Sequence, residues 1–271
     1  MSLASPLVSP LAHPLSAVRQ RIAQAAAAAG RDPRSVTLLA VSKTFPAEDI
    51  ARAAALGQTA FGENYVQEAV DKIAALRPDW PALQWHFIGP LQSNKTRDVA
   101  EHFDWVHSID RLKLTQRLSD QRPAELEPLQ VCIQVNVDGE TTKSGVRPED
   151  ASALAAAVAA LPRLRLRGLM CIPEPRADAA AQRAPFARLR ELRDAIAAEH
   201  GLTLDTLSSA LLWAPKPDGR QRNQARPARL GKRPGAGCVV PRRNPRQSAV
   251  AGAARAGRQP AGWPGGSVDL R

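Results

Sequence analysis

Short apolar runs alternate with amphipathic stretches along residues 1–208. The first run, Val36–Lys43, is aliphatic and β-branched, which is typical of a strand buried on both faces. Pro46 then opens a stretch with helical spacing, and Gly57 ends it. Further strands are predicted at Thr59–Gly62, Leu83–Ile88, Trp105–Ser108, Leu129–Val137, Leu164–Ile172 and Thr203–Ser208. Further helices are predicted at Leu15–Ala29, Tyr65–Leu76, from about Ser93, from about Arg111, at 150–160 and at 184–199.

This alternation of strands and helices predicts parallel strands joined by right-handed helical crossovers. Two α/β folds are compatible with it, an open doubly wound sheet and a closed TIM-type (β/α)8 barrel. No G-x-G-x-x-G motif follows the first strand, which disfavours the open sheet. Seven strands within 208 residues therefore indicate a (β/α)8 barrel with an extra N-terminal helix and a missing eighth β/α unit. Such a barrel should be open between its first and seventh strands, whose edges would then lack partners.

The net charge of +11 comes entirely from the C-terminal segment. Residues 209–271 hold 13 of the 37 basic residues and two of the 26 acidic ones, so residues 1–208 carry 24 of each. Arg, Ala, Gly and Pro fill 39 of these 63 positions. All four have codons that begin with two G or C bases, so a frameshift in a GC-rich gene would explain the composition. A naturally disordered basic tail is the competing explanation.

Several classes of protein are disfavoured. No stretch approaches the ~18 apolar residues of a membrane span. Three cysteines do not form a disulfide framework, which favours a cytoplasmic location. The sequence also lacks zinc-ligand spacing, a P-loop and a G-x-S-x-G motif.

Polar residues stand at the predicted strand ends, where parallel α/β folds place their chemistry. Lys43 follows the first strand directly, and partial burial would make its amine a nucleophile towards aldehydes. Taken alone, it could equally be a solvated loop lysine. The same ambiguity holds for Asn64, which suits either a ligand hydroxyl or a turn, and for His86, which suits either a flat cofactor or the core. Lys143 is a second candidate amine on the loop after the fifth strand.

The strand ends together resemble one family. The motifs are AVSKTFP (40–46), AFGENYVQEAVDK (60–72), WHFIGPLQSNKTRDV (85–99), HSIDR (107–111), KSGV (143–146), RLRGLMCIP (165–173) and LDTLS (204–208). They resemble the pyridoxal phosphate homeostasis proteins, a family similar to the N-terminal barrel of alanine racemase. The match runs from about Leu15 to Ser208.

The resemblance implies that pyridoxal 5'-phosphate (PLP) is held as a Schiff base on Lys43. It also implies that Asn64, His86, Met170 and Ser208 line the PLP pocket. The family carries and buffers PLP in the cytoplasm, so a non-catalytic carrier is expected rather than an enzyme. Expected partners are PLP itself and apo PLP-dependent enzymes, with no membrane, and an intact homologue is expected to be a monomer.

The sequence departs from the family after Ser208. The family continues with a Gly-Met-Ser segment and later a Val-Arg-Ile-Gly-Thr segment, and neither is present here. These segments would supply the eighth strand and the groups that hold the phosphate. We therefore expect an incomplete PLP-binding barrel domain over residues 1–208, followed by a disordered basic tail over 209–271, and impaired PLP binding.

Two other functions remain open from the residues. A PLP-dependent racemase or decarboxylase would need a second acid/base group opposite Lys43, and Tyr65 is the only tyrosine. A nucleic-acid-binding protein would use the arginines of the tail, such as Arg242, Arg243 and Arg246. Only one aromatic residue follows Trp213, so the tail offers no stacking surface for bases.

Overall fold

The computed structural model describes residues 11–140, 144–176, 178–210 and 237–241. Eight strands in these residues form a closed barrel in the order β1 to β8. The strands are β1 (Val36–Val41), β2 (Ala60–Glu63), β3 (Gln84–Phe87), β4 (Trp105–Ile109), β5 (Leu129–Gln134), β6 (Leu164–Cys171), β7 (Thr206–Ala210) and β8 (Gly237–Pro241). The predicted barrel and its seven parallel strands are confirmed.

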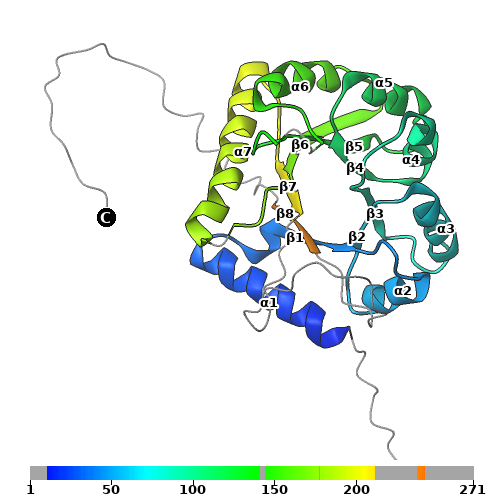
Figure 1. The fold of residues 1–271 in the computed structure, drawn as a ribbon. Helices are drawn as coiled ribbons and strands as arrows, with labels where there is room; N and C mark the ends of the chain where they lie inside the picture. Colours follow the sequence, from blue (N-terminus) through cyan, green and yellow to red (C-terminus); the bar gives the residue numbers. More distant parts are fainter. Residues whose placement is uncertain (1–10, 141–143, 177, 211–236, 242–271) are drawn as a thin grey trace, which may run out of the picture.

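The helices surround the barrel (Figure 1). They are α1 (Ala12–Ala28), α2 (Ala47–Ala55), α3 (Val66–Leu76), α4 (Thr96–His102), α5 (Leu112–Gln121), α6 (Ala151–Ala159) and α7 (Ala179–His200), with 3-10 turns at Pro33–Ser35, Ser93–Lys95 and Pro148–Asp150. The extra N-terminal helix α1 covers β1, and Arg19 anchors it to the end of α2 through the Leu56 carbonyl. No helix in the described part of the chain is long and apolar enough to cross a membrane.

Helix α7 begins five residues before its predicted start. The Asp178 carboxylate accepts a hydrogen bond from the Ala181 amide and caps the helix at 178. Pro185 lies inside the helix rather than at its first turn. The cap therefore determines the start of α7, and the proline, which usually marks a first turn, does not.

The barrel is closed where an opening was predicted. Residues 237–241, within the segment expected to be a disordered tail, form β8 between β1 and β7. β8 runs antiparallel to both neighbours, with Val36–Ala40 paired to Pro241–Gly237 and Ser209–Ala210 paired to Val239–Cys238. The prediction of an open barrel is thus wrong, because the unpaired edges of β1 and β7 take up a strand that is not part of a β/α unit.

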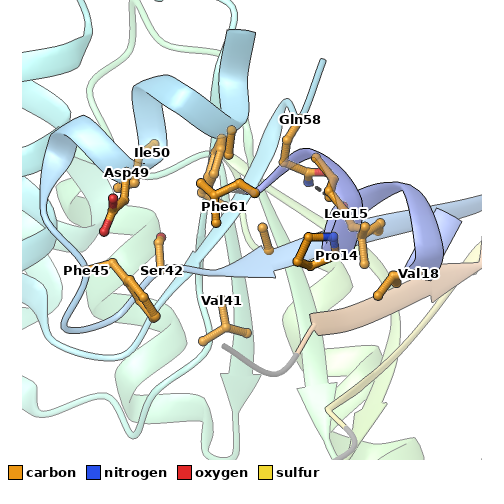
Figure 2. A pocket seen from close by; sticks show the side chains of 14 residues that line it. Pro14, Leu15, Val18, Val41, Ser42, Phe45, Asp49, Ile50, Gln58 and Phe61 are labelled. Atoms are coloured by element: carbon orange, nitrogen blue, oxygen red, sulfur yellow. Dashed lines mark hydrogen bonds between the residues drawn. The ribbon is translucent and has the colours of Figure 1, made fainter. Parts of the chain in front are cut away.

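β1 is less buried than its sequence predicted. Only Leu39 is fully buried, and the other five residues of the strand are partly buried. A cavity of about 240 Å³ borders the strand and lies between α1, β1 and α2 (Figure 2). Leu38 and Ala40 of β1 line it together with Leu15 of α1 and Ile50 of α2. Leu38 and Ala40, which point away from the barrel interior, are therefore incompletely covered by α1 and α2.

Gly168 allows β6 and β7 to approach closely. The pairing of β5 with β6 shifts register at this point, since Val131 pairs with Leu166 but Cys132 pairs with Gly168. A Cβ atom at 168 would lie 1.8 Å from the Thr206 carbonyl oxygen. The shift also places Arg167 over the Trp105 ring at 5.1 Å and pairs its guanidinium with Asp205.

We expect Gly168→Ala to lower the free energy of unfolding by at least ~3 kcal/mol, because backbone rather than a flexible side chain must move. Gly201→Ala is the matched control, since Gly201 has a φ of +65° at the end of α7 but nothing within 4 Å of an added Cβ. The control should cost only about 1 kcal/mol. Urea unfolding of both variants tests this, and equal losses would contradict the close approach.

We expect β8 to be required for a monomeric barrel. A chain ending at Ala236 leaves the edges of β1 and β7 unpaired, and such edges promote strand pairing between molecules. A chain ending at Arg243 retains β8 and is the control. Light scattering during gel filtration should show association of the shorter chain only. A monodisperse shorter chain with an unchanged melting temperature would show that β8 does not close the barrel in solution.

Candidate functional site

Strand alternation places the predicted site residues on the inner face of the barrel. Val41, Gly62 and His86 are register partners on β1, β2 and β3, and so point to the same face. Lys43 and Asn64 each lie two residues further along and continue this face. On the far side, Met170 and Ser208 are register partners on β6 and β7. Met170 packs with Trp105 and Cys132 in an inner cluster that is separate from the main core between strands and helices.

Lys43 lies just beyond the end of β1 and is half-buried. Its amine makes no hydrogen bond or ion pair with any described residue. The residues on either side of it are both fixed. Ser42 is buried and donates its hydroxyl hydrogen to the Glu63 carboxylate at 2.7 Å. Thr44 adopts a φ of +65° and donates its amide hydrogen to Glu68 at 2.6 Å. The backbone that carries Lys43 is therefore fixed while its amine stays available.

The groups that fix this backbone converge on one buried ammonium. Lys72 of α3 donates hydrogen bonds to the Ser42 carbonyl at 2.8 Å, to Glu63 at 2.8 Å and to Glu68 at 2.5 Å. Glu63 is fully buried, and this burial raises the pKa of its carboxyl although Lys72 and Ser42 favour the charged form. Removing one partner of such a buried pair typically costs about 3–5 kcal/mol, because the other charge is left uncompensated. The hydrogen bonds of Lys72 therefore hold the backbone beside Lys43 firmly in place.

Asn64 presents an unused hydrogen-bonding atom. Its Oδ1 is buried and accepts no hydrogen bond from any described residue. Gly89 allows the Asn64 backbone to pack closely against it, because a Cβ at 89 would lie 2.4 Å from the Asn64 carbonyl oxygen. A buried carbonyl oxygen without a donor is costly unless a ligand supplies one. Asn64 therefore suits a ligand with a hydroxyl or N–H group.

Three side chains form a hydrogen-bonded chain across the barrel. The His86 Nδ1 lies 2.9 Å from the His107 Nε2, and the His107 Nδ1 lies 2.7 Å from the Ser208 Oγ. The His86 ring also stacks on Trp105, with centroids 5.4 Å apart and planes 11° apart. All three residues of the chain are buried, and burial lowers the pKa of His107 to about 3. His107 is therefore neutral near neutral pH.

The structure thus brings Lys43, Asn64, His86, Met170 and Ser208 to one inner face, and their role in holding PLP stays a prediction. His107 was not among the predicted site residues. It lies two positions after Trp105 on β4 and therefore points to the same inner face. The alternation of side chains along the strand could have identified it. Ser42, Glu63 and Lys72 were also missed as determinants of the Lys43 backbone.

Other predicted groups lie elsewhere. Lys143 falls outside the described residues, as do the tail arginines. Tyr65 is 56% exposed at the start of α3, so it does not face the barrel interior as a second acid/base group. Within the described ranges, no group of three or more His, Cys, Asp or Glu side chains could hold a metal ion.

Comparison with known proteins agrees with this architecture. A family model described as the N-terminal domain of alanine racemase matches residues 14–227. A pyridoxal phosphate homeostasis protein of Pseudomonas aeruginosa is 61% identical over 204 residues, which are 75% of this chain and 86% of that protein. A protein of the same name from Escherichia coli is 60% identical over 169 residues, which are 62% of this chain and 72% of that protein.

Solved structures show the same relationship. PipY of Synechococcus elongatus, solved with PLP bound, is 39% identical with a TM-score of 0.59, covering 69% of this chain and 87% of PipY. Alanine racemase of Bacillus anthracis, at 14% identity and a TM-score of 0.51, covers 72% of this chain and 50% of the racemase, and supports the fold alone. The family model spans most of this chain, and the Pseudomonas relative is matched over most of its own length. The chain therefore belongs to the pyridoxal phosphate homeostasis protein family.

Proposed function

We propose that this chain binds PLP covalently through the amine of Lys43 and serves as a carrier in PLP homeostasis. The observation that carries the proposal is the fixed backbone at 42–44, whose half-buried Lys43 amine has no hydrogen-bond partner among the described residues. The name of the Pseudomonas relative and the PLP in the PipY structure support the choice of ligand. PLP supplies an aldehyde, which condenses reversibly with an unprotonated primary amine and releases water.

The inner face fits such a ligand in two further respects. The buried Asn64 Oδ1 offers an acceptor that no described residue uses. The stacked rings of His86 and Trp105 give the barrel interior a flat aromatic surface. An acceptor and an aromatic surface suit a planar ring that carries a hydroxyl group.

A carrier is favoured over a racemase or decarboxylase. Those reactions move a proton on the substrate and need an acid/base group beside the reacting carbon. Tyr65 is exposed on α3, and His107 is held neutral by burial and already hydrogen-bonded to His86 and Ser208. Apo PLP-dependent enzymes are the recipients that a carrier would serve.

The phosphate of PLP is expected to be held weakly. In barrels of this type, phosphate sites are built by the loops after the seventh and eighth strands. This chain lacks the Gly-Met-Ser and Val-Arg-Ile-Gly-Thr segments of the family after Ser208. Its β8 is antiparallel, so the end of β8 that leads into the following chain lies at the opposite end of the barrel from the ends of β1 to β7.

Borohydride reduction of the PLP-treated protein should place the pyridoxyl group on Lys43, and Lys43→Ala should abolish this labelling. Lys113→Ala is the control, because Lys113 is exposed on α5 outside the barrel. Peptide mapping by mass spectrometry identifies the labelled residue. Labelling chiefly at Lys143 or at other lysines would refute the assignment of Lys43.

The chain should discriminate little between PLP and pyridoxal, which lacks the phosphate. Each charge-assisted hydrogen bond to the phosphate contributes roughly 1.5–3 kcal/mol, so losing two or three costs on the order of 3–6 kcal/mol, or about two to four decades in affinity. The Pseudomonas relative is the control and should prefer PLP strongly. Absorbance titrations of both proteins with both ligands test this. An equal preference for PLP in the two proteins would contradict the loss of the phosphate site.

A further inference from the structure

The hydrogen-bonded chain of Ser208, His107 and His86 takes no part in the proposed covalent attachment. His107 is the central member, with one ring nitrogen facing Ser208 and the other facing His86. A neutral imidazole carries one proton, so one of its nitrogens donates and the other accepts. The direction of one hydrogen bond of His107 therefore fixes the direction of the other.

Only two proton arrangements satisfy both contacts. If the His107 Nδ1–H donates to the Ser208 oxygen, the His107 Nε2 must accept a hydrogen from the His86 Nδ1. The His86 Nε2 is then an acceptor. If the Ser208 hydroxyl donates to the His107 Nδ1, the His107 Nε2–H donates to the His86 Nδ1, and the proton of a neutral His86 lies on its Nε2.

We propose that His107 is a positioning residue that couples the hydroxyl direction of Ser208 on β7 to the tautomer of His86 on β3. Ser208 and His86 are 122 positions apart in the sequence and lie on opposite sides of His107 in the barrel. The stacking of His86 on Trp105 restricts rotation of its ring, so the coupling changes the position of a proton and leaves the ring in place.

The coupling gives an anion that reaches Ser208, two residues before the end of β7, control over His86. An anion that accepts the Ser208 hydroxyl hydrogen forces the first arrangement, in which the His107 Nδ1 donates to Ser208 and the His86 Nε2 accepts. This part rests on the proposed function, because a phosphate monoester such as PLP is the anion expected at that end of the barrel. Bound phosphate would thereby convert His86 into an acceptor for a donor group of the same ligand.

The first test uses the ligand-free full chain with 15N-labelled histidine rings. Protonated and unprotonated ring nitrogens have well-separated 15N shifts, so long-range 1H–15N spectra report each tautomer. His86 and His107 should carry their protons on the same ring position, both on Nδ1 or both on Nε2. Opposite positions would overturn the proposal. The rings of His13, His102 and His200 serve as internal references.

Variants test whether the coupling passes through His107. Ser208→Ala should change the tautomer populations of His86, whereas Ser209→Ala, at the neighbouring position of opposite phase on β7, should leave them unchanged. In a His107→Gln background, Ser208→Ala should no longer affect His86. A response of His86 that persists in that background, or no response in the parent chain, would overturn the proposal. Unchanged backbone spectra of α3 and α5 check that each variant is folded.

The anion is tested with inorganic phosphate and separately with PLP. Either should move His86 and His107 together to the Nδ1-protonated form, with no effect in the Ser208→Ala variant. In the His107→Gln variant neither anion should change the His86 tautomer, because the connection to Ser208 is removed. Amide shifts along β7 without a change at His86 would overturn the coupling. Failure of Lys43 labelling, by contrast, would refute only the proposed function, since the ligand-free measurements do not involve PLP.

Discussion

Every strand of this barrel needs a hydrogen-bonded neighbour on both sides, and the seven β/α units alone cannot provide one for β1 and β7. The gap is filled by a short antiparallel strand from the C-terminal segment. Closure keeps β1 and β7 at the separation of two strands, and so brings Lys43, after β1, and Ser208, on β7, around the same interior. The candidate site thus depends on backbone pairing by residues that belong to no β/α unit.

Within the closed barrel, two polar systems have different roles. The system around Lys72 lies outside the strand ring and holds both residues that flank Lys43. Its charges are buried together, so each needs the others. The system around His107 lies inside the ring, is neutral, and connects opposite strands. The charged system fixes the backbone, and the neutral one leaves a proton position adjustable.

Much of the fold and site follows from patterns along the sequence. Apolar runs predicted all seven parallel strands. Lys43, Asn64, His86, Met170 and Ser208 share the inner face, and their contacts with PLP stay a prediction. The contact between His107 and Ser208 cannot be predicted from local patterns. The two residues are 101 positions apart and meet only because the barrel closes. The predicted start of α7 at 184 is five residues late, because the Asp178 carboxylate caps the helix at 178. β8 was missed because five residues within an Arg- and Pro-rich segment carry no periodic signal.

Because β8 is antiparallel, its amino-acid sequence is less constrained than that of a strand in a β/α unit. A parallel strand in a β/α unit must also lead into a helix that covers its outer face, so its sequence is constrained over some 25 residues or more. An antiparallel strand without such a helix needs only N–H and C=O groups in an extended backbone. Many short segments of sufficient reach satisfy that condition, and β8 itself ends in a proline, Pro241, opposite Val36. Barrel closure at this position is therefore tolerant of sequence, and a segment that forms no β/α unit can still complete the ring.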